Sequence, residues 1–252
     1  MIGLFVFLLV TTAVLAFVST GAATADRRTR EATMGSQARA SLDEMLRELR
    51  AAKQIRRTSV VNGKTYATDA RNIVFETPSH TNSTGIIADK YDVVAFVYDA
   101  AAGTLTETTF VNTGSQRPAR QAMVIARNVA DAAYTYRVRE QFRITSPQTS
   151  FALKTTSGTR PVAYVNGAPA EVTSGANTNG VTLASSTALQ SAAPGAPVDI
   201  QVLYTVDPAA NSTGITHVNG VDVKLTLSEK DGRAITRTVT LAGNARLRNQ
   251  RT

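Results

Sequence analysis

The sequence predicts an α+β protein in which one long N-terminal helix, apolar in its first half, packs on an antiparallel β-sheet head. Three observations predict this fold class. The chain opens with an uninterrupted apolar run, IGLFVFLLVTTAVLAFV at 2–18. Apolar residues then recur at helical spacing from Met34 to Ala52. Beyond Arg57, apolar and polar residues alternate with the two-residue period of strands.

Composition narrows the class of protein further. With 252 residues, 43% of them hydrophobic, the chain is large enough to bury a core, which excludes a disordered protein. It has no cysteine, and its histidines are His80 and His217, so thiol chemistry is excluded and imidazole metal sites nearly so. The net charge of +8 favours anionic surfaces such as phospholipid headgroups or nucleic acid, but the basic residues are spread out, as on an ordinary solvated surface.

The N-terminal segment is long enough to cross a membrane. No charged side chain occurs before Asp26, and a helix over 2–25 would span about 36 Å at about 1.5 Å per residue, against a hydrocarbon core of about 30 Å. Residues 1–25 are therefore the predicted transmembrane segment. The side chains expected at its membrane or assembly surface are Leu4, Phe5, Phe7, Leu8, Leu9, Val14, Leu15 and Phe17.

A cleaved secretory signal is the competing interpretation of this segment. Ala23-Thr24-Ala25 fits a small-x-small cleavage site. Against it, no basic residue precedes the apolar run, and the run is long for a signal peptide.

The helical pattern continues beyond Asp26. Residues 26–57 are the predicted amphipathic continuation of a single helix from Ile2 to about Ile55, and no proline occurs before Pro78. Its apolar stripe is expected to pack on the head through Met34, Leu42, Met45, Leu46 and Leu49.

The opposite face of this continuation is charged. Asp43 and Arg47 stand at favourable i,i+4 distance, whereas Glu44 and Glu48 form an unfavourable like-charge pair. A single-pass anchor followed by an unrelated helix is the alternative to one continuous helix.

Residues 58–252 form the predicted β-rich head, a sheet with one buried face covered by the helix stripe. An Asn62-Gly63 turn predicts a hairpin, and Asp231-Gly232 predicts another. The expected strands are Thr58–Val61, Lys64–Thr68, Asn72–Glu76, Tyr91–Tyr98, Thr104–Val111, Met123–Val129, Tyr134–Ile144, Val198–Val206, Val221–Leu227 and Ile235–Leu241.

A low-complexity insertion interrupts the head near 146–197. Its charged residues are Lys154, Arg160 and Glu171, and small polar residues dominate the rest. This composition predicts an exposed insertion with short strands around Val162–Val165, where a partner contact could vary.

No catalytic motif appears in the sequence. It contains no phosphate-binding loop, dinucleotide fingerprint, zinc-protease motif or serine triad order, so no enzyme activity, cofactor or metal is predicted. Asp89, Asp92 and Asp99 carry oxygen ligands suited to a hard cation, but their spacing fits no calcium loop. A solvated strand edge is the better interpretation of these aspartates.

Four stretches carry a family resemblance. They read SQARASLDEMLRELRAAKQI at 36–55, YDVVAFVYDAAAGTLTETTF at 91–110, MVIARNVADAAYTYRV at 123–138 and VDVKLTLSEKDGRAITRTVTLAGNARLRNQ at 221–250. Behind an apolar N-terminal helix, this order resembles type IV pilin-like proteins, in particular the minor pilins and the J-type pseudopilins of type II secretion.

The resemblance implies a subunit that acts in assembly or at the tip of a type IV pilus or type II secretion pseudopilus. Its partners would be other minor pilins or pseudopilins, the major subunit and cytoplasmic membrane lipid. It would sit in the inner membrane as a single pass, with the head outside the cytoplasm, and residues 1–25 would then move from lipid into the filament core. Small residues such as Ala13, Ala16, Gly21 and Ala22 would be helix contact points.

The family's processing site departs from this sequence. Its members carry a basic leader ending in glycine and a glutamate at the fifth mature position, where this chain has Phe5, or Leu8 if cut after Gly3. We expect Met1 to correspond to a residue just after that glutamate, with the leader upstream and a prepilin peptidase as a further partner.

Two other function classes stay open. One is a signal-peptide-cleaved or membrane-anchored β-rich binding protein of the cell envelope. The other is DNA capture by a basic filament tip, which suits the charge but has no motif in the sequence.

Overall fold

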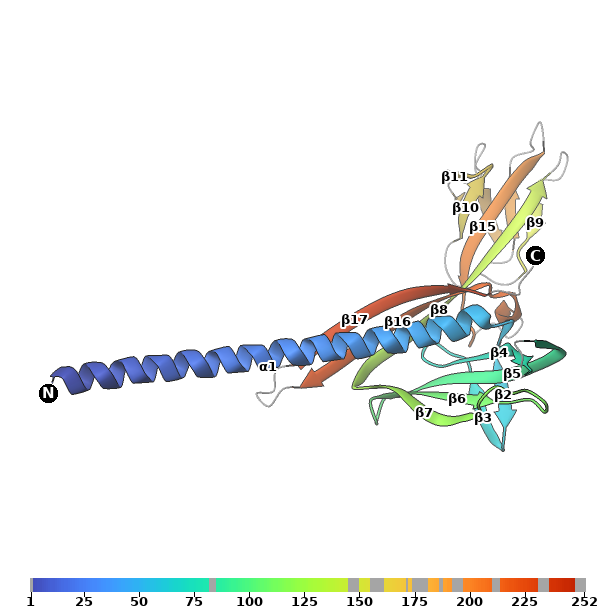
Figure 1. Ribbon diagram of the computed structural model, residues 1–252. Helices are drawn as coiled ribbons and strands as arrows, with labels where there is room; N and C mark the ends of the chain where they lie inside the picture. Colours follow the sequence, from blue (N-terminus) through green and yellow to red (C-terminus); the bar gives the residue numbers. More distant parts are fainter. Residues whose placement is uncertain are drawn as a thin grey trace.

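A single helix runs from the N-terminal end of the molecule into a β-rich head (Figure 1). In the computed structural model this helix, α1 (Ile2–Ala51), has 50 residues and is about 75 Å long at about 1.5 Å per residue. Its first half projects freely and its second half lies along the head. The predicted α+β fold class is confirmed. The structure describes residues 2–81, 85–144, 150–154, 161–170, 172–173, 181–185, 188–191, 197–209, 214–230 and 236–247.

The helix ends earlier than its sequence pattern predicts. The pattern extends to about Ile55, but α1 stops at Ala51 and the chain forms strand β1 (Gln54–Arg56). The backbone N–H of Lys53 donates to the carbonyl of Glu76 at 2.7 Å. This hydrogen bond places the chain after the helix beside the strand that contains Glu76. Ile55 is fully buried as a strand residue. Pairing with a distant strand therefore overrides the local helical preference.

Strand β1 lies at the edge of a five-stranded antiparallel sheet. The strand order is β1-β4-β5-β6-β7. The other members are β4 (Ile73–His80), β5 (Ile86–Asp99), β6 (Thr104–Phe110) and β7 (Arg120–Arg127). The strands predicted in this part of the chain are confirmed, and β4 and β5 extend further than predicted. Strand β7 begins earlier than predicted and ends at Arg127, so Val129, the predicted end of this strand, begins the following strand instead.

The Asn-Gly hairpin forms a separate two-stranded sheet. It pairs β2 (Thr58–Val61) with β3 (Lys64–Ala67). Asn62 and Gly63 have φ angles of 51° and 75°, the left-handed conformation that a two-residue turn of this type requires. The predicted hairpin is confirmed.

A six-stranded antiparallel sheet forms the other side of the head. Its order is β11-β10-β15-β8-β16-β17. The central strand β8 (Val129–Ile144) has 16 residues and changes neighbour along its length, pairing with β15 (Val198–Val206) and with β16 (Gly220–Lys230). A short 3₁₀ helix, η1 (Gly214–His217), precedes β16.

The last strand, β17 (Thr236–Arg246), pairs with β16 and confirms the predicted closing hairpin. The predicted Asp231-Gly232 turn lies outside the described residues. The described strands thus form several sheets rather than the single sheet that the sequence suggests: β8, β15, β16 and β17 belong to the six-stranded sheet, whereas β1 and β4–β7 pair among themselves in the five-stranded one.

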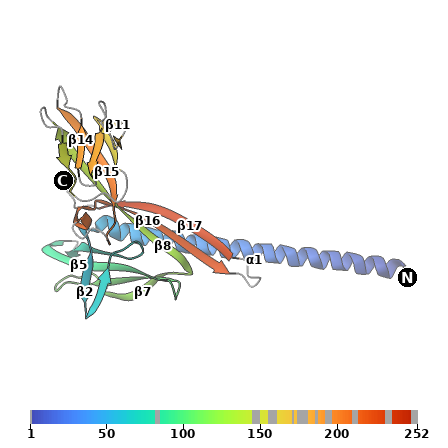
Figure 2. The same cartoon turned by 180° about the vertical axis from the view of Figure 1, so that it is seen from behind.

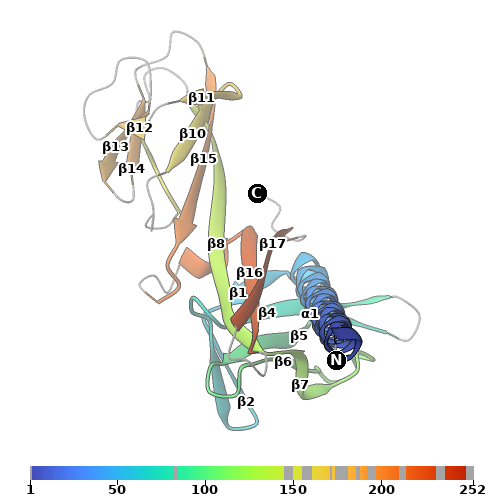
Figure 3. The same ribbon diagram turned by 90° about the vertical axis from the view of Figure 1, so that its left-hand side faces the viewer.

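The second half of α1 lies between the two large sheets. It contacts β16 and β17 on one side and β4 and β7 on the other, and the view along the helix axis shows this placement (Figure 3). The helix stripe and both sheets share one hydrophobic core, in which Met45 and Leu49 join Phe75 and Phe96.

The insertion forms an arm that projects from the head on the side away from the free helix end (Figures 1 and 2). The outer parts of β8 and β15 extend into it, and β10 (Val162–Val165) and β11 (Ala168–Ala170) add to β15. Strand β10 confirms the predicted strand there. A four-stranded sheet, β12-β13-β14-β9, packs in the same arm; its strands are β9 (Ser150–Ala152), β12 (Val172–Thr173), β13 (Val181–Ser185) and β14 (Ala188–Ser191).

Candidate membrane-inserting helix and its anchorage to the head

The free half of α1 exposes a continuous apolar surface. Phe7 is 71% exposed and Phe17 is 81% exposed. The other large apolar side chains exposed along this segment are Leu8, Leu9, Val10, Val14, Leu15 and Val18. Leu4 and Phe5 belong to the helix backbone, but their side chains lie outside the described part of the chain.

Such a surface is unstable in water. Burying one side chain of this size is worth about 1.5–3 kcal/mol, and here several are left exposed along one helix. Contiguous exposed apolar surface marks a contact with membrane or protein. By length and composition, α1 contains a segment apolar enough to cross a membrane, and none of the most apolar stretch is buried within the molecule.

The polar side chains of this segment are satisfied within the helix. The hydroxyls of Thr11 and Thr12 each donate to the carbonyl four residues earlier at 2.7 Å, and that of Thr20 does so at 2.8 Å. In lipid an unsatisfied hydroxyl costs several kcal/mol, so these internal bonds make the segment compatible with an apolar environment.

Charged residues begin where the apolar segment ends. Arg30 donates to Asp26 at 3.0 Å and also lies 3.7 Å from Glu229 of β16. Arg237 of β17 pairs with Glu31 at 2.5 Å. The β16–β17 hairpin therefore meets α1 one turn beyond the apolar segment, which leaves that segment free along its whole length.

The head-facing stripe of α1 is buried. The structure places all of its predicted packing residues against the sheets, with exposures of 7% or less: Met34, Leu42, Met45, Leu46 and Leu49. Ser41 adds a polar contact, because its hydroxyl donates to the carbonyl of Ile125 in β7 at 2.6 Å.

Two arginines outside the helix hold its acidic residues. The Arg120 guanidinium lies 2.8 Å from Glu44 and 2.6 Å from Glu107 of β6. The hydrogen bond with Glu44 raises the pKa of Arg120 above its ordinary value. Burial lowers this pKa in part, and the hydrogen bond with Glu107 raises it further. Arg117 pairs with Glu48 and also donates to Thr77.

These partners resolve the like-charge pair that the sequence shows. The i,i+4 repulsion between Glu44 and Glu48 is offset because each carboxylate has its own arginine. Arg47 pairs with Glu44 rather than with Asp43. Sequence reasoning missed Arg117 and Arg120 because both lie far from the helix along the chain, and no local spacing indicates them.

A buried aspartate shapes the loop that carries Arg117. Asp92 is fully buried and accepts hydrogen bonds from Ser79 Oγ, Ser115 Oγ and the backbone N–H of Asn112, each at 2.8 Å. The expectation of a solvated strand edge is therefore wrong for Asp92, although Asp89 and Asp99 are exposed. A buried carboxylate is stable here because donors surround it.

No metal-ligating cluster of three or more histidine, cysteine or acidic residues occurs within the part of the chain that the structure describes. The chain matches no protein-family model, no curated protein and no solved structure at a significant level. The fold itself therefore gives the class: an α+β protein whose long N-terminal helix is exposed and apolar at one end and packed into a β-rich head at the other, a layout compatible with a pilin-like fold.

Proposed function

We propose that this protein is a pilin-like assembly subunit, a minor pilin or pseudopilin that acts in the assembly or at the tip of a type IV pilus or a type II secretion pseudopilus, and not an enzyme. The observation that carries the proposal is the continuity of α1, which passes without a break from an exposed apolar segment into the core of the head. Such a helix can exchange lipid for neighbouring helices while the head stays attached.

The anchorage of the head supports this use of the helix. A subunit drawn from lipid into a filament is pulled along its helix, so the head must not slide on it. The buried stripe and the ion pairs of Glu44 and Glu48 fix the helix against both large sheets. Arg27 and Arg28 follow the apolar segment and have no acidic partner among the described residues, which suits a position at the surface of anionic lipid.

The proposed setting is the inner membrane, with the head outside the cytoplasm until the subunit joins the filament. The partners are then other minor subunits and the major subunit, together with the prepilin peptidase if a leader precedes Met1. The rival function is an envelope binding protein whose N-terminal segment is a plain anchor or is removed. The exposed apolar helix suits an anchor equally well, so the test must separate anchoring from assembly.

The sequence has no cysteine, so disulfide cross-linking through one introduced cysteine tests the proposal without competing thiols from this chain. Ala16→Cys places one thiol on the free half of α1, and Val60→Cys, on the exposed β2–β3 hairpin, is the matched control. We expect mild oxidation of sheared filaments and membranes to join the Ala16→Cys protein to another subunit carrying a cysteine at the equivalent helix position. The control thiol should give no such product.

Mass spectrometry of the mature N-terminus completes the experiment. A terminus just before the apolar segment, in protein recovered with filaments, supports the proposal. A mature chain beginning at Asp26 contradicts it and favours the envelope binding protein. Intact chain confined to membranes, without filament association or helix cross-links, also rejects the assembly role and leaves an anchored protein.

A further inference from the structure

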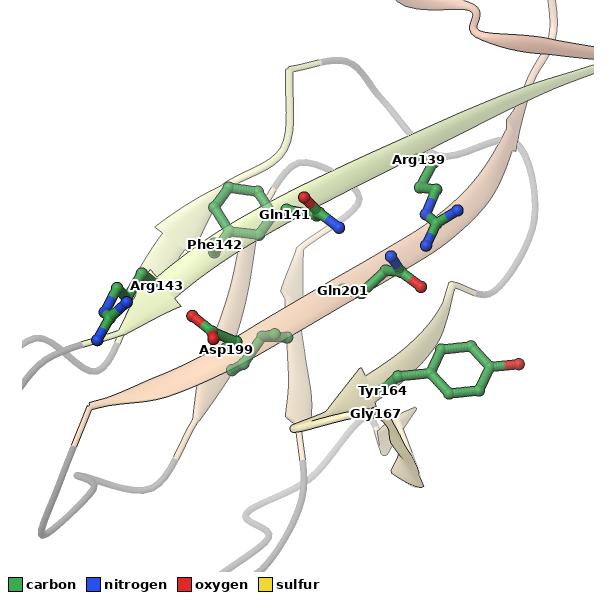
Figure 4. Close-up of a pocket in the computed structure, with 9 residues that line it drawn as sticks. Arg139, Gln141, Phe142, Arg143, Tyr164, Gly167, Asp199 and Gln201 are labelled. Atoms are coloured by element: carbon green, nitrogen blue, oxygen red, sulfur yellow. The ribbon is translucent and has the colours of Figure 1, made fainter. Parts of the chain in front are cut away.

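The arm carries a groove that assembly through α1 does not use. It lies on the exposed face of the six-stranded sheet, across β8, β15 and β10 (Figure 4). The side chains that matter to the argument are Arg139, Gln141, Arg143, Tyr164, Asp199 and Gln201. They come from alternate positions of their strands, the spacing that puts side chains on one face of a sheet.

Strand register brings these residues into rows. Gln141 of β8 is the cross-strand partner of Gln201 of β15, which is in turn the partner of Tyr164 of β10. Two side-chain amides and a phenol thus lie side by side across three strands. Arg143 is the partner of Asp199 in the next row of the same face. The two amides can form directional hydrogen bonds with a ligand, and the tyrosine ring can stack on it.

The position of β15 in this groove is fixed by the β10–β11 turn. The backbone N–H of Asn166 donates to the carbonyl of Asp199 at 2.8 Å, and the side-chain oxygen of Asn166 accepts from the backbone N–H of Asp199 at 3.0 Å. Asn166 and Gly167 both have positive φ, as this tight turn requires. The groove is therefore built on paired strands and a tied turn rather than on a free loop.

The two arginines of the groove have no acidic partner within the described part of the chain. Neither Arg139 nor Arg143 forms an ion pair within the described part of the chain. Arg139 Nε is buried and has no hydrogen-bond partner among the described residues. By contrast Arg137, two residues earlier on the same face, is paired with Asp222. A half-buried guanidinium left without an acceptor marks a place where an external acceptor binds.

The charge of the groove identifies the class of ligand. Its two arginines and one aspartate leave only a small positive excess. Asp199 would repel a dense polyphosphate such as a nucleic acid, which favours ligands with isolated acid groups. Side-chain amides and a carboxylate form hydrogen bonds with hydroxyl groups, and an aromatic ring stacks on the apolar face of a sugar. An arginine guanidinium forms two parallel hydrogen bonds with a carboxylate.

From this arrangement we propose that the arm groove binds an acidic saccharide, with Arg143 and Arg139, at opposite ends of the groove, each holding a carboxylate of a different sugar unit, Gln141 and Gln201 its hydroxyls, and Tyr164 a ring face (Figure 4). The arm lies at the opposite end of the molecule from the free end of α1, so a membrane around that helix would not cover the groove (Figure 1). The inference goes beyond the proposed assembly role and does not depend on it.

The test uses the full-length chain in detergent micelles and isothermal titration calorimetry with trigalacturonic acid as the probe. Arg143→Gln and Tyr164→Ala are expected to weaken binding about tenfold or more, the loss typical of one charge-assisted or stacking contact. Arg137→Gln is the matched control: it removes the same charge from the same face of β8, outside the groove, and should bind as the parent chain does. Circular dichroism of each variant establishes that it is folded.

Three results with saccharide probes overturn the proposal: no binding of trigalacturonic acid by the parent chain, an equal loss of affinity in Arg137→Gln, or equally tight binding of neutral maltotriose. Tighter binding of a single-stranded oligonucleotide than of trigalacturonic acid rejects it in favour of a nucleic-acid site. These results leave the cross-linking of α1 unaffected, so the two proposals fail independently.

Discussion

Gly243 of β17 faces Leu46 of α1 so closely that a Cβ built on the glycine would lie 2.6 Å from Leu46 Cδ1. Leu46 is itself buried in the core. The missing side chain at 243 is therefore what lets the helix approach the last strand. This contact ties α1, which carries the exposed apolar segment, to the C-terminal hairpin of the head.

Gly243→Ala is expected to lower the free energy of unfolding by about 1–3 kcal/mol, the usual cost of overfilling a packed core. Thermal unfolding in detergent measures it. Gly35→Ala is the control: nothing lies within 4 Å of its new Cβ, and alanine is the better helix former, so stability should rise by about 0.5–1 kcal/mol. In a Leu46→Ala background the cost of Gly243→Ala should shrink, and an undiminished cost would contradict this steric explanation.

Arg120→Ala is expected to be more damaging than any surface ion-pair variant. It leaves Glu107, which is 1% exposed, without its cation, and breaking a buried pair costs about 3–5 kcal/mol. Arg120 also pairs with Glu44 of α1, and so does Arg47, whose side chain is 66% exposed. Arg47→Ala should therefore cost under about 1 kcal/mol of stability. Denaturant unfolding of both variants measures the difference.

A second substitution separates charge burial from lost packing in that experiment. In Arg120→Ala/Glu107→Gln the buried negative charge is gone, so much of the stability lost in Arg120→Ala should return. If the double variant is as unstable as the single one, the arginine acts through its contacts with the helix alone.

The sequence predicted the elements with strong local signals. The apolar segment of α1, the Asn62-Gly63 hairpin and the alternating strands β5 and β16 follow from residue period and turn chemistry, which act over a few residues. The exposed half of the candidate site was predictable for the same reason, because apolar length alone identifies it.

What the sequence did not reveal depends on partners distant in the chain. Ile55 continues a helical pattern, yet it enters β1 because β4 pairs with it. Asp92 looks like a surface residue until Ser79 and Ser115 are brought around it. The arm groove likewise exists only because register aligns Gln141 with Gln201, and neither residue belongs to a recognisable motif.

Tyr134 and Tyr136 give a pair of substitutions with opposite expected signs. The Tyr136 hydroxyl donates to the Asp69 carbonyl at 2.7 Å, with the Asn72 carbonyl at 3.1 Å, whereas the buried Tyr134 hydroxyl has no partner among the described residues. Tyr136→Phe should therefore lose about 1 kcal/mol of stability, and Tyr134→Phe should gain about 1 kcal/mol by removing an unsatisfied group. A loss in Tyr134→Phe would show that its hydroxyl is satisfied, for instance by a buried water.

The same two tyrosines predict how stability depends on pH. Burial, with smaller contributions from nearby groups, raises the pKa of Tyr134 and of Tyr136 above the ordinary value of about 10. The folded state thus keeps protons that the unfolded state releases, so the stability that they contribute is fully present below about pH 10 and is lost as pH rises toward the folded-state pKa values. In this alkaline window each tyrosine should lower the free energy of unfolding by about 1.4 kcal/mol per pH unit.

Denaturant unfolding between neutral and strongly alkaline pH measures the slope. Tyr134→Phe/Tyr136→Phe should flatten it relative to the parent chain, and an unchanged slope would assign the alkaline loss to other groups.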